Sequence, residues 1–262
     1  MENEQITFSF GKNWRSFVDT VSEDTVARAR RDIEEWLGAE TVAGKTVLDI
    51  GSGSGIHSLC YFLLGAKEIV SFDLDPFSVE STRLLWQRAG GPSNWHVTQG
   101  SILDPDFVAG LAKHDIVYSW GVLHHTGAMW KALDVAASLV KDGGRFWIAI
   151  YVKTPEYPQQ LALKQSYNRA SKFGKKVLEW KEIYKIMKAR WHAGLNPLAW
   201  NEKKGRGMDI YHDIKDWLGG LPYEVASKEE VVDFCRERGF LVEKISEGEA
   251  NTIYLFSLTE RS

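Results

Sequence analysis

The sequence has little of what marks secreted, metal-binding or membrane-spanning proteins. Its 262 residues include only two cysteines, Cys60 and Cys235, which have no metal-site spacing and do not suggest a disulfide framework. No apolar run approaches the ~20 residues that a membrane span needs, and residues 1–5 do not begin a signal peptide. Asp, His and Glu do not cluster at metal-ligand spacing. We therefore expect a cytoplasmic protein with two reduced core cysteines, no bound metal and no membrane partner.

The chain is long enough for one elaborated α/β domain, and its charge is unevenly distributed. Hydrophobic residues make up 44% of the sequence, which supports a substantial core. The formal net charge is −3, yet residues 151–220 carry 14 Lys and Arg against 7 Asp and Glu. This basic block is either a solvated helical surface or a region that attracts an anionic acceptor.

A glycine-rich turn near residue 50 is the most informative stretch of the sequence. Val47, Leu48 and Ile50 form a short apolar run, followed by glycines at 51, 53 and 55 and then by an apolar segment, 56–64, that ends at a glycine. This pattern predicts a strand, a tight turn and a buried helix. The turn differs from the dinucleotide fingerprint G-x-G-x-x-G, because Ile56 stands where its third glycine would fall.

The segment from Asp49 to Gly55, Asp-x-Gly-x-Gly-x-Gly, resembles motif I of the class I S-adenosylmethionine-dependent methyltransferases. The next predicted strand, 68–73, ends in Asp73, at the place of the acid that binds the cofactor's ribose hydroxyls in that family. The resemblance continues through segments 100–104, 115–120 and 139–144, and covers roughly residues 45–152.

This resemblance implies S-adenosylmethionine as the cofactor, as well as a set of residues that hold it. The set comprises Asp49, Gly51, Ser52, Gly53, Gly55, Asp73, Leu74, Ser101, Ile102 and Trp120. N-terminal segments fold over the cofactor in the resembled family, so Phe10 and Trp14 are added to the set, although core packing explains these two aromatic residues equally well.

Strands and helices alternate along most of the chain. Apolar patterns predict strands at 46–50, 68–73, 95–99, 113–120 and 145–151, separated by helical segments, and this order is typical of a parallel, doubly wound sheet. A capping box at 227–230 starts a helix, and segments 240–245 and 252–258 predict an antiparallel hairpin. The predicted fold is therefore α/β, with a doubly wound, mostly parallel seven-stranded sheet, a C-terminal antiparallel hairpin and a helical insertion.

Three regions follow from this order. Residues 1–152 comprise an N-terminal helix and the cofactor-binding core, residues 153–220 the insertion, and residues 221–262 the helix and hairpin that complete the core. We expect the insertion to form a helical lid over the catalytic face. Its helical stripe of Val177, Trp180, Tyr184, Met187 and Trp191 predicts a core-facing surface.

Histidine and tyrosine side chains supply the candidates for catalysis. His124 and His125 directly follow the fourth strand, Tyr151 ends the fifth, and His212 lies in the insertion. Histidine has the unperturbed pKa best suited to remove a proton at neutral pH. Helix capping and exposure to solvent explain these residues equally well. Among them we expect His125 to act as the base. His212 can reach the site only if the lid closes.

The leading hypothesis is methylation of a small polar molecule at a hydroxyl oxygen. The acceptor would be a sugar, a sugar nucleotide or a natural product. After the fourth strand the chain reads Ser-Trp-Gly-Val, without the Asn/Asp-Pro-Pro-Tyr/Phe motif of amino-group methyltransferases. The main alternative is an RNA methyltransferase whose basic, tryptophan-rich insertion holds phosphates and stacks bases. A non-catalytic scaffold that binds the cofactor is a weaker alternative. The sequence does not indicate an oligomeric state.

Overall fold

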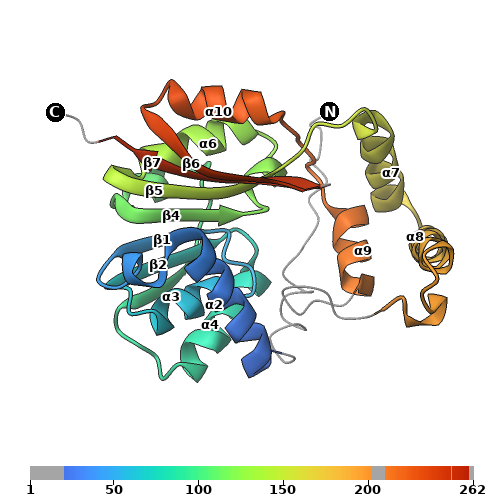
Figure 1. Cartoon of the computed structure of the whole chain (residues 1–262), viewed down its shortest axis with the longest axis horizontal. Helices are drawn as coiled ribbons and strands as arrows, with labels where there is room; N and C mark the ends of the chain where they lie inside the picture. The colour runs from blue at the N-terminus through green and yellow to red at the C-terminus, as the bar shows by residue number, and fades with distance from the viewer. Residues whose placement is uncertain (1–20, 202–209, 249, 260–262) are drawn as a thin grey trace.

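Seven strands form a single sheet in the order β3-β2-β1-β4-β5-β7-β6 (Figure 1). The structure is a computed structural model that describes residues 21–201, 210–248 and 250–259. The strands are β1 (Thr46–Ile50), β2 (Glu68–Asp73), β3 (Trp95–Gln99), β4 (His114–Trp120), β5 (Val140–Tyr151), β6 (Phe240–Glu247) and β7 (Asn251–Leu258). β1 to β5 are parallel, whereas β7 is antiparallel to β5 and β6 is antiparallel to β7. The predicted fold class is confirmed.

Helices cover both faces of this sheet, as a doubly wound fold requires. On one face α2 (Glu23–Leu37), α3 (Ile56–Leu63) and α4 (Pro76–Arg88) enclose a core around Val47, Tyr61 and Trp147. On the other face α5 (Pro105–Ala109), α6 (Met129–Ser138) and α10 (Lys228–Arg236) enclose a second core around Leu48 and Phe256. The strand order reverses between β1 and β4, and ligands of such sheets bind beside the carboxyl ends of the strands at that point.

Local capping signals set the helix boundaries. Ser22 accepts a hydrogen bond from the Thr25 N–H at the start of α2, and Asp75 caps α4 with Pro76 in its first turn. The predicted capping box of α10 is present, since Ser227 and Glu230 each accept the other's backbone N–H. Residues 142–144 lie inside β5, where the pairing with β4 shifts register between His114 and Ile116.

The part of the insertion that the structure describes contains three helices with a hydrophobic core of their own. α7 (Tyr157–Arg169), α8 (Lys172–His192) and α9 (Ile210–Gly219) pack around Tyr167, Ile183 and Leu218, with a short 3-10 turn, η3 (Pro197–Ala199), after α8. Figure 1 shows them beside the end of the sheet toward which the β4 arrow points. The helical insertion of the predicted fold is thus present, although its action as a lid remains a prediction.

One expectation for the insertion is correct only in part. Of the predicted stripe, Met187 packs against the core of the insertion, whereas the side chains of Val177, Trp180, Tyr184 and Trp191 are exposed on the outer side of α8. The inner side of the same helix carries Ile183, together with Leu178 and Ile186, and these aliphatic residues make the packing contacts. The helical period was correct, but α8 has two apolar faces and the aromatic one points outward.

Both cysteines are buried and free, as expected for core residues. Burial raises the pKa of each thiol to about 12, so both stay protonated at neutral pH. Among the residues that the structure describes, no helix combines the length and the apolar character that crossing a membrane requires.

Candidate cofactor and acceptor site

Two glycines of the loop between β1 and α3 lie too close to neighbouring residues to be replaced by a residue with a Cβ atom. A Cβ atom on Gly51 would lie 2.4 Å from Val122 Cγ2, and one on Gly55 would lie 2.8 Å from the Cα of Thr82 in α4. Both glycines also have positive φ, which disfavours other residues. Ser52 Oγ lies 2.9 Å from Thr82 Oγ1 and so fastens the loop to α4. The loop is therefore a fixed backbone surface at the carboxyl end of β1.

Asp73, at the carboxyl end of β2, has the geometry of a ribose acceptor. Its Oδ2 accepts the Gly53 N–H at 3.0 Å, and its Oδ1 accepts the Asp75 N–H at 2.9 Å. Each carboxylate oxygen can accept more than one hydrogen bond, so both retain capacity for a hydroxyl. Burial raises the pKa of Asp73 to about 6, which leaves the carboxylate ionised at neutral pH. These groups fit the ribose of S-adenosylmethionine.

Asp49 lies beneath the loop rather than on its surface. Its buried carboxylate accepts a hydrogen bond from Ser58 Oγ at 2.5 Å, and Ser58 Oγ lies 2.6 Å from Ser71 Oγ, which accepts the Trp95 Nε1–H. Burial raises the pKa of Asp49 to about 7. Asp49 thus joins β1, α3, β2 and β3 through hydrogen bonds.

The remaining predicted cofactor residues divide into exposed and buried positions. Leu74 follows Asp73 and is 64% exposed, which is unusual for a leucine beside a strand end, while Ile102 is buried. Ser101 accepts the Leu103 N–H and so shapes the turn after β3. Trp120 ends β4, where its ring contacts those of His57 and Trp147. Phe10 and Trp14 lie outside the described residues.

The two adjacent histidines of η2 (Leu123–His125) have different hydrogen bonds. His125 Nδ1 lies 2.6 Å from the carbonyl oxygen of Pro222, whereas His124 Nδ1 accepts the backbone N–H of Tyr151 at 3.3 Å. A carbonyl only accepts, so His125 carries its hydrogen on Nδ1, and its Nε2 holds a lone pair when the ring is neutral. His124 has the opposite tautomer, with a buried Nε2–H that finds no hydrogen-bond partner among the described residues.

Burial keeps both histidines neutral. It lowers the pKa of His125 to about 4 and that of His124 well below its ordinary value, and the ammonium group of Lys164 lowers both further. His125 is only partly buried by its neighbours, whereas His124 is fully enclosed. Of the two, His125 is therefore the side chain that a ligand at this edge can reach.

Aromatic rings surround the histidines to form what we call the histidine–tyrosine cluster: His124, His125, Tyr151, Tyr157 and Tyr223. The ring centroid of Tyr151 lies 3.9 Å from that of His124 and 5.3 Å from that of His125. The ring centroid of Tyr223 lies 5.3 Å from that of Tyr151. Tyr157 donates its hydroxyl hydrogen to the Tyr223 carbonyl at 3.1 Å. The cluster joins η2 and β5 of the core to α7 of the insertion and to the segment after α9.

Lys164 of α7 lies behind this cluster. Its side chain is fully buried, with the Nζ atom 4.5 Å from the ring centroid of Tyr223 and 4.7 Å from that of Trp217. It donates a hydrogen bond to the Trp217 carbonyl, and the Asp216 carboxylate attracts its charge. Burial lowers its pKa to about 7. The cluster therefore borders on a weakly held positive charge.

Sequence reasoning placed three of the four catalytic candidates together. His124, His125 and Tyr151 are in mutual ring contact, while His212 lies in α9, where its side chain is outside the described set. It missed Tyr157, Lys164, Pro222 and Tyr223. Pro222 is 97 residues from His125, and a backbone carbonyl has no sequence signature, so no signal in the chain could have paired them.

The arrangement defines a class of protein. A glycine loop after β1, an acid closing β2, and a reversed β7 beside β5 in a seven-stranded sheet are the features of a class I methyltransferase. The sequence model described as "Methyltransferase domain" matches residues 41–190, and the chain belongs to this family. The protein is a class I S-adenosylmethionine-dependent methyltransferase, and S-adenosylmethionine is its cofactor.

Individual relatives resemble this chain over different spans. Ribosomal protein L11 methyltransferase of Streptococcus mutans is 38% identical over 101 residues, which are 38% of this chain and 30% of that protein. The match thus spans about a third of the curated relative.

Solved structures extend the likeness of fold over nearly the whole chain. Magnesium protoporphyrin IX methyltransferase from Synechocystis, with bound SAH, has a TM-score of 0.52 at 15% identity, covering 94% of this chain and 83% of that one. An O-methyltransferase family protein from Burkholderia thailandensis has a TM-score of 0.53 at 15% identity, covering 96% and 58%. At such identity the likeness is one of fold alone.

Proposed function

We propose that the protein methylates a hydroxyl group of a small polar molecule, with His125 as the base that takes the hydroxyl proton. The observation that carries this is the 2.6 Å contact between His125 Nδ1 and the Pro222 carbonyl oxygen. It fixes the tautomer in which Nε2 is the proton acceptor, in the same way that a partner on one ring nitrogen orients catalytic histidines generally.

The surroundings of His125 support a hydroxylated acceptor with a flat or ring-shaped body. Tyr151 and Tyr223 offer aromatic faces next to the imidazole, and such faces pack against sugar rings and aromatic natural products. A sugar, a sugar nucleotide or a phenolic intermediate fits this description. Lys164 adds a positive charge behind the cluster, which favours an acceptor that becomes an anion as it loses its proton.

Each group of the site then has a separate part in the reaction. S-adenosylmethionine supplies an electrophilic methyl group when bound. The loop at Gly51–Gly55 and the Asp73 carboxylate hold the cofactor at the ends of β1 and β2, and Asp49 ties the strand before that loop to the helix after it through Ser58. His125 Nε2 receives the hydroxyl proton and becomes an imidazolium whose Nδ1–H stays bonded to Pro222.

A coupled assay for S-adenosylhomocysteine release, run on a panel of sugars, sugar nucleotides, phenolic metabolites and bulk tRNA, tests this function. We expect turnover with a hydroxylated small molecule. With that acceptor, His125→Ala should lower kcat by about a hundredfold or more, since general bases contribute ~10²–10⁴. Its affinity for S-adenosylmethionine should match that of the parent.

The matched control is His96→Ala, which removes an exposed histidine on β3 and should leave kcat unchanged. Because the pKa of His125 lies at about 4, kcat of the parent should stay level from pH 8 down to about pH 5 and then fall. Parental turnover in His125→Ala would remove the base from the mechanism. Turnover of tRNA, or of an amine but of no hydroxyl in the panel, would overturn the acceptor class.

A further inference from the structure

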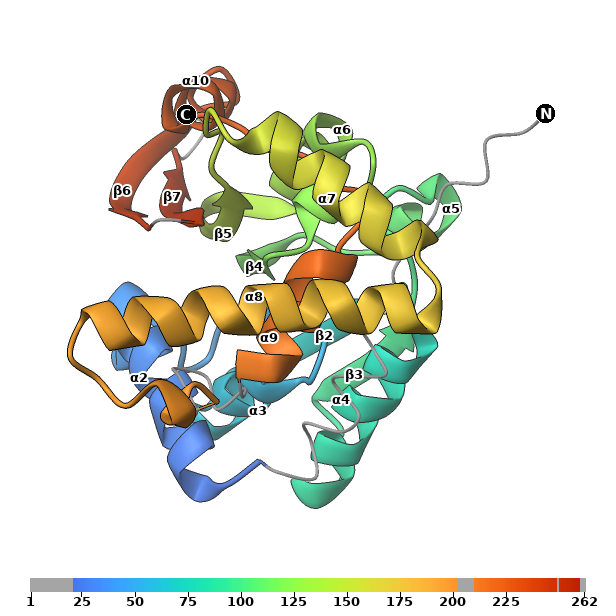
Figure 2. The same ribbon diagram turned by 90° about the vertical axis from the view of Figure 1, so that its right-hand side faces the viewer.

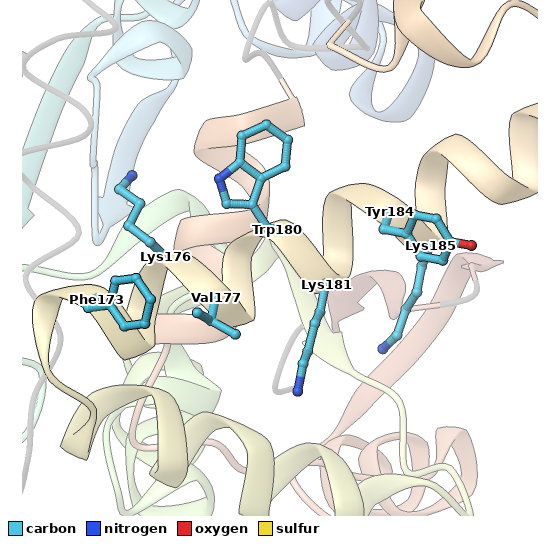
Figure 3. Close-up of a pocket in the computed structure, with 7 residues that line it drawn as sticks. All are labelled: Phe173, Lys176, Val177, Trp180, Lys181, Tyr184 and Lys185. Carbon is cyan, nitrogen blue, oxygen red and sulfur yellow. The ribbon is translucent and has the colours of Figure 1, made fainter.

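The outer side of α8 carries a row of large apolar side chains that are exposed to solvent. We call it the aromatic ridge: Phe173, Val177, Trp180, Tyr184 and Trp191. Their spacing of three, four or seven residues places them on one side of the helix. Trp180 is 61% exposed and Trp191 73% exposed, and Leu195 and Leu198 extend the apolar surface beyond the helix end. Figure 3 shows the first part of the ridge standing on α8 with lysines beside it.

The fold of the insertion does not need this ridge. The inner side of α8 is already packed by Ile183 and held by Glu179, whose carboxylate accepts hydrogen bonds from Tyr167 at 2.9 Å and Tyr211 at 2.7 Å. Large contiguous apolar patches are uncommon on the surface of a soluble domain, and they mark interaction sites when they occur. The aromatic ridge is therefore a contact surface and not a by-product of helix packing.

The charge around the ridge selects an anionic partner. Helix α8 carries seven Lys and Arg residues against two glutamates, Glu179 and Glu182, in a chain whose net charge is −3. Glu179 is buried and bonded to Lys176, and Glu182 pairs with Lys185. Lys181 makes no ion pair with any described residue and lies beside Trp180 and Tyr184 in the same groove. Lys176, Lys181 and Lys185 thus line the same groove as the first part of the aromatic ridge.

The shape and composition of the ridge distinguish among anionic partners. Figure 2 shows α8 lengthwise, running across the insertion on the outside of the molecule, and Figure 1 shows the same helix end-on at the edge of the molecule. Its 21 residues present a row of about 30 Å. Val177, Leu195 and Leu198 have no ring on which a nucleic-acid base could stack, which argues against single-stranded RNA as the partner. A second copy of α8 would bring like charges together, which argues against a dimer through this helix.

Contrary to the sequence-based expectation of no membrane partner, we propose that α8 binds the surface of an anionic lipid bilayer. The helix lies in the plane of the headgroups, with Trp180, Tyr184 and Trp191 inserted at the boundary with the acyl chains and the flanking lysines on the lipid phosphates. Aromatic residues on one side and lysines around them are the composition of interfacial helices. Attraction to acidic lipids adds to the binding for each lysine held near the surface. Binding of α8 to a bilayer is independent of which acceptor the enzyme methylates.

Cosedimentation of the full chain with vesicles tests the proposal. The protein should bind phosphatidylcholine vesicles that contain phosphatidylserine, and bind vesicles of phosphatidylcholine alone at least about tenfold more weakly. The double variant Trp180→Ser/Trp191→Ser should lose about tenfold or more in partitioning to the anionic vesicles. Lys181→Glu/Lys188→Glu should lose a similar factor, and raised salt should weaken the parent in the same direction.

Controls and contrary outcomes follow from the same surface. Leu63→Ser and Lys67→Glu/Lys113→Glu change exposed residues on the core and should bind vesicles like the parent. Circular dichroism should show that all variants keep the parental helix content, as expected for exposed positions. Parental partitioning by the tryptophan variant would overturn the proposal. So would tight binding of single-stranded RNA without vesicle binding, or a dimer in sedimentation velocity that Trp180→Ser/Trp191→Ser abolishes.

Discussion

Gly51 and Val122 are in direct contact, with room for no more than a hydrogen atom on the glycine. Gly51 belongs to the loop that faces the cofactor, and Val122 begins the turn that carries His124 and His125. The His125 N–H donates to the Val122 carbonyl at 2.8 Å, so the residue whose side chain packs on Gly51 also bonds the backbone of His125. The position of His125 is thereby coupled to the position of the glycine loop.

Gly51→Ala should therefore be more harmful than its backbone angle alone predicts. A left-handed φ of +74° costs an alanine about 1–2 kcal/mol, and the collision with Val122 adds about 1–3 kcal/mol of overpacking. Gly44→Ala is a matched control, because Gly44 also has φ +74° but nothing within 4 Å of an added Cβ. Urea unfolding of the two variants isolates the collision. Equal midpoints would mean that Val122 moves aside without cost.

Asp73→Ala should weaken S-adenosylmethionine binding by at least tenfold. If Asp73 accepts hydrogen bonds from both ribose hydroxyls, as the family resemblance implies, the substitution removes two charge-assisted hydrogen bonds, each worth about 1.5–3 kcal/mol. It also releases the N–H groups of Gly53 and Asp75. Glu68→Ala is the control, since Glu68 is a carboxylate at the opposite end of the same strand. Isothermal titration calorimetry measures both. Parental affinity in Asp73→Ala, or tight NADH binding by the parent, would contradict the assignment.

Asp49 should make the protein less stable as the pH rises. Its folded-state pKa is about 7, above the ordinary 3.8, so the folded chain holds a proton that the unfolded chain releases between those values. The stabilisation is complete below pH 4 and is lost as the pH rises through 7. Asp49→Asn should remove this contribution to the pH dependence of the free energy of unfolding, while the amide oxygen of the asparagine can still accept the hydrogen bond from Ser58.

The measurement is the difference in free energy of unfolding between parent and Asp49→Asn at pH 5 and pH 8. We expect the free energy of unfolding of the variant, relative to that of the parent, to be higher at pH 8 than at pH 5. The reason is that a buried ionised carboxylate destabilises the folded state when its partner is only a hydroxyl. A difference that does not change with pH would show that Asp49 is ionised throughout.

Short-range patterns were sufficient to predict the sheet. Glycines 51 and 55 and the terminal acid of β2 have local reasons for their positions, so the cofactor side of the site could be read from the chain. The strands and caps likewise depend on neighbours a few residues away.

Nothing local distinguishes the two apolar sides of α8, however, because Trp180 and Ile183 are equally good interior residues. The side that packs is decided by α7 and α9.

The acceptor side depends on contacts between distant segments. His125 could be singled out as a candidate from its place after β4, but its tautomer comes from the Pro222 carbonyl. Lys164 reads in the sequence as an ordinary solvated lysine of a basic helix. Its burial between Trp217 and Tyr223 arises only when α7 and α9 come together.

The segment at 221–226 belongs to both halves of the molecule. Its Pro222 and Tyr223 carbonyls bond His125 of the core and Tyr157 of the insertion, while the Glu224 carboxylate accepts the Met129 N–H at the start of α6. The three helices of the insertion are consequently not an exchangeable cassette. Transplanting α7 to α9 into another methyltransferase core without these six residues would carry over the shape of the acceptor region but leave its histidine without a defined tautomer.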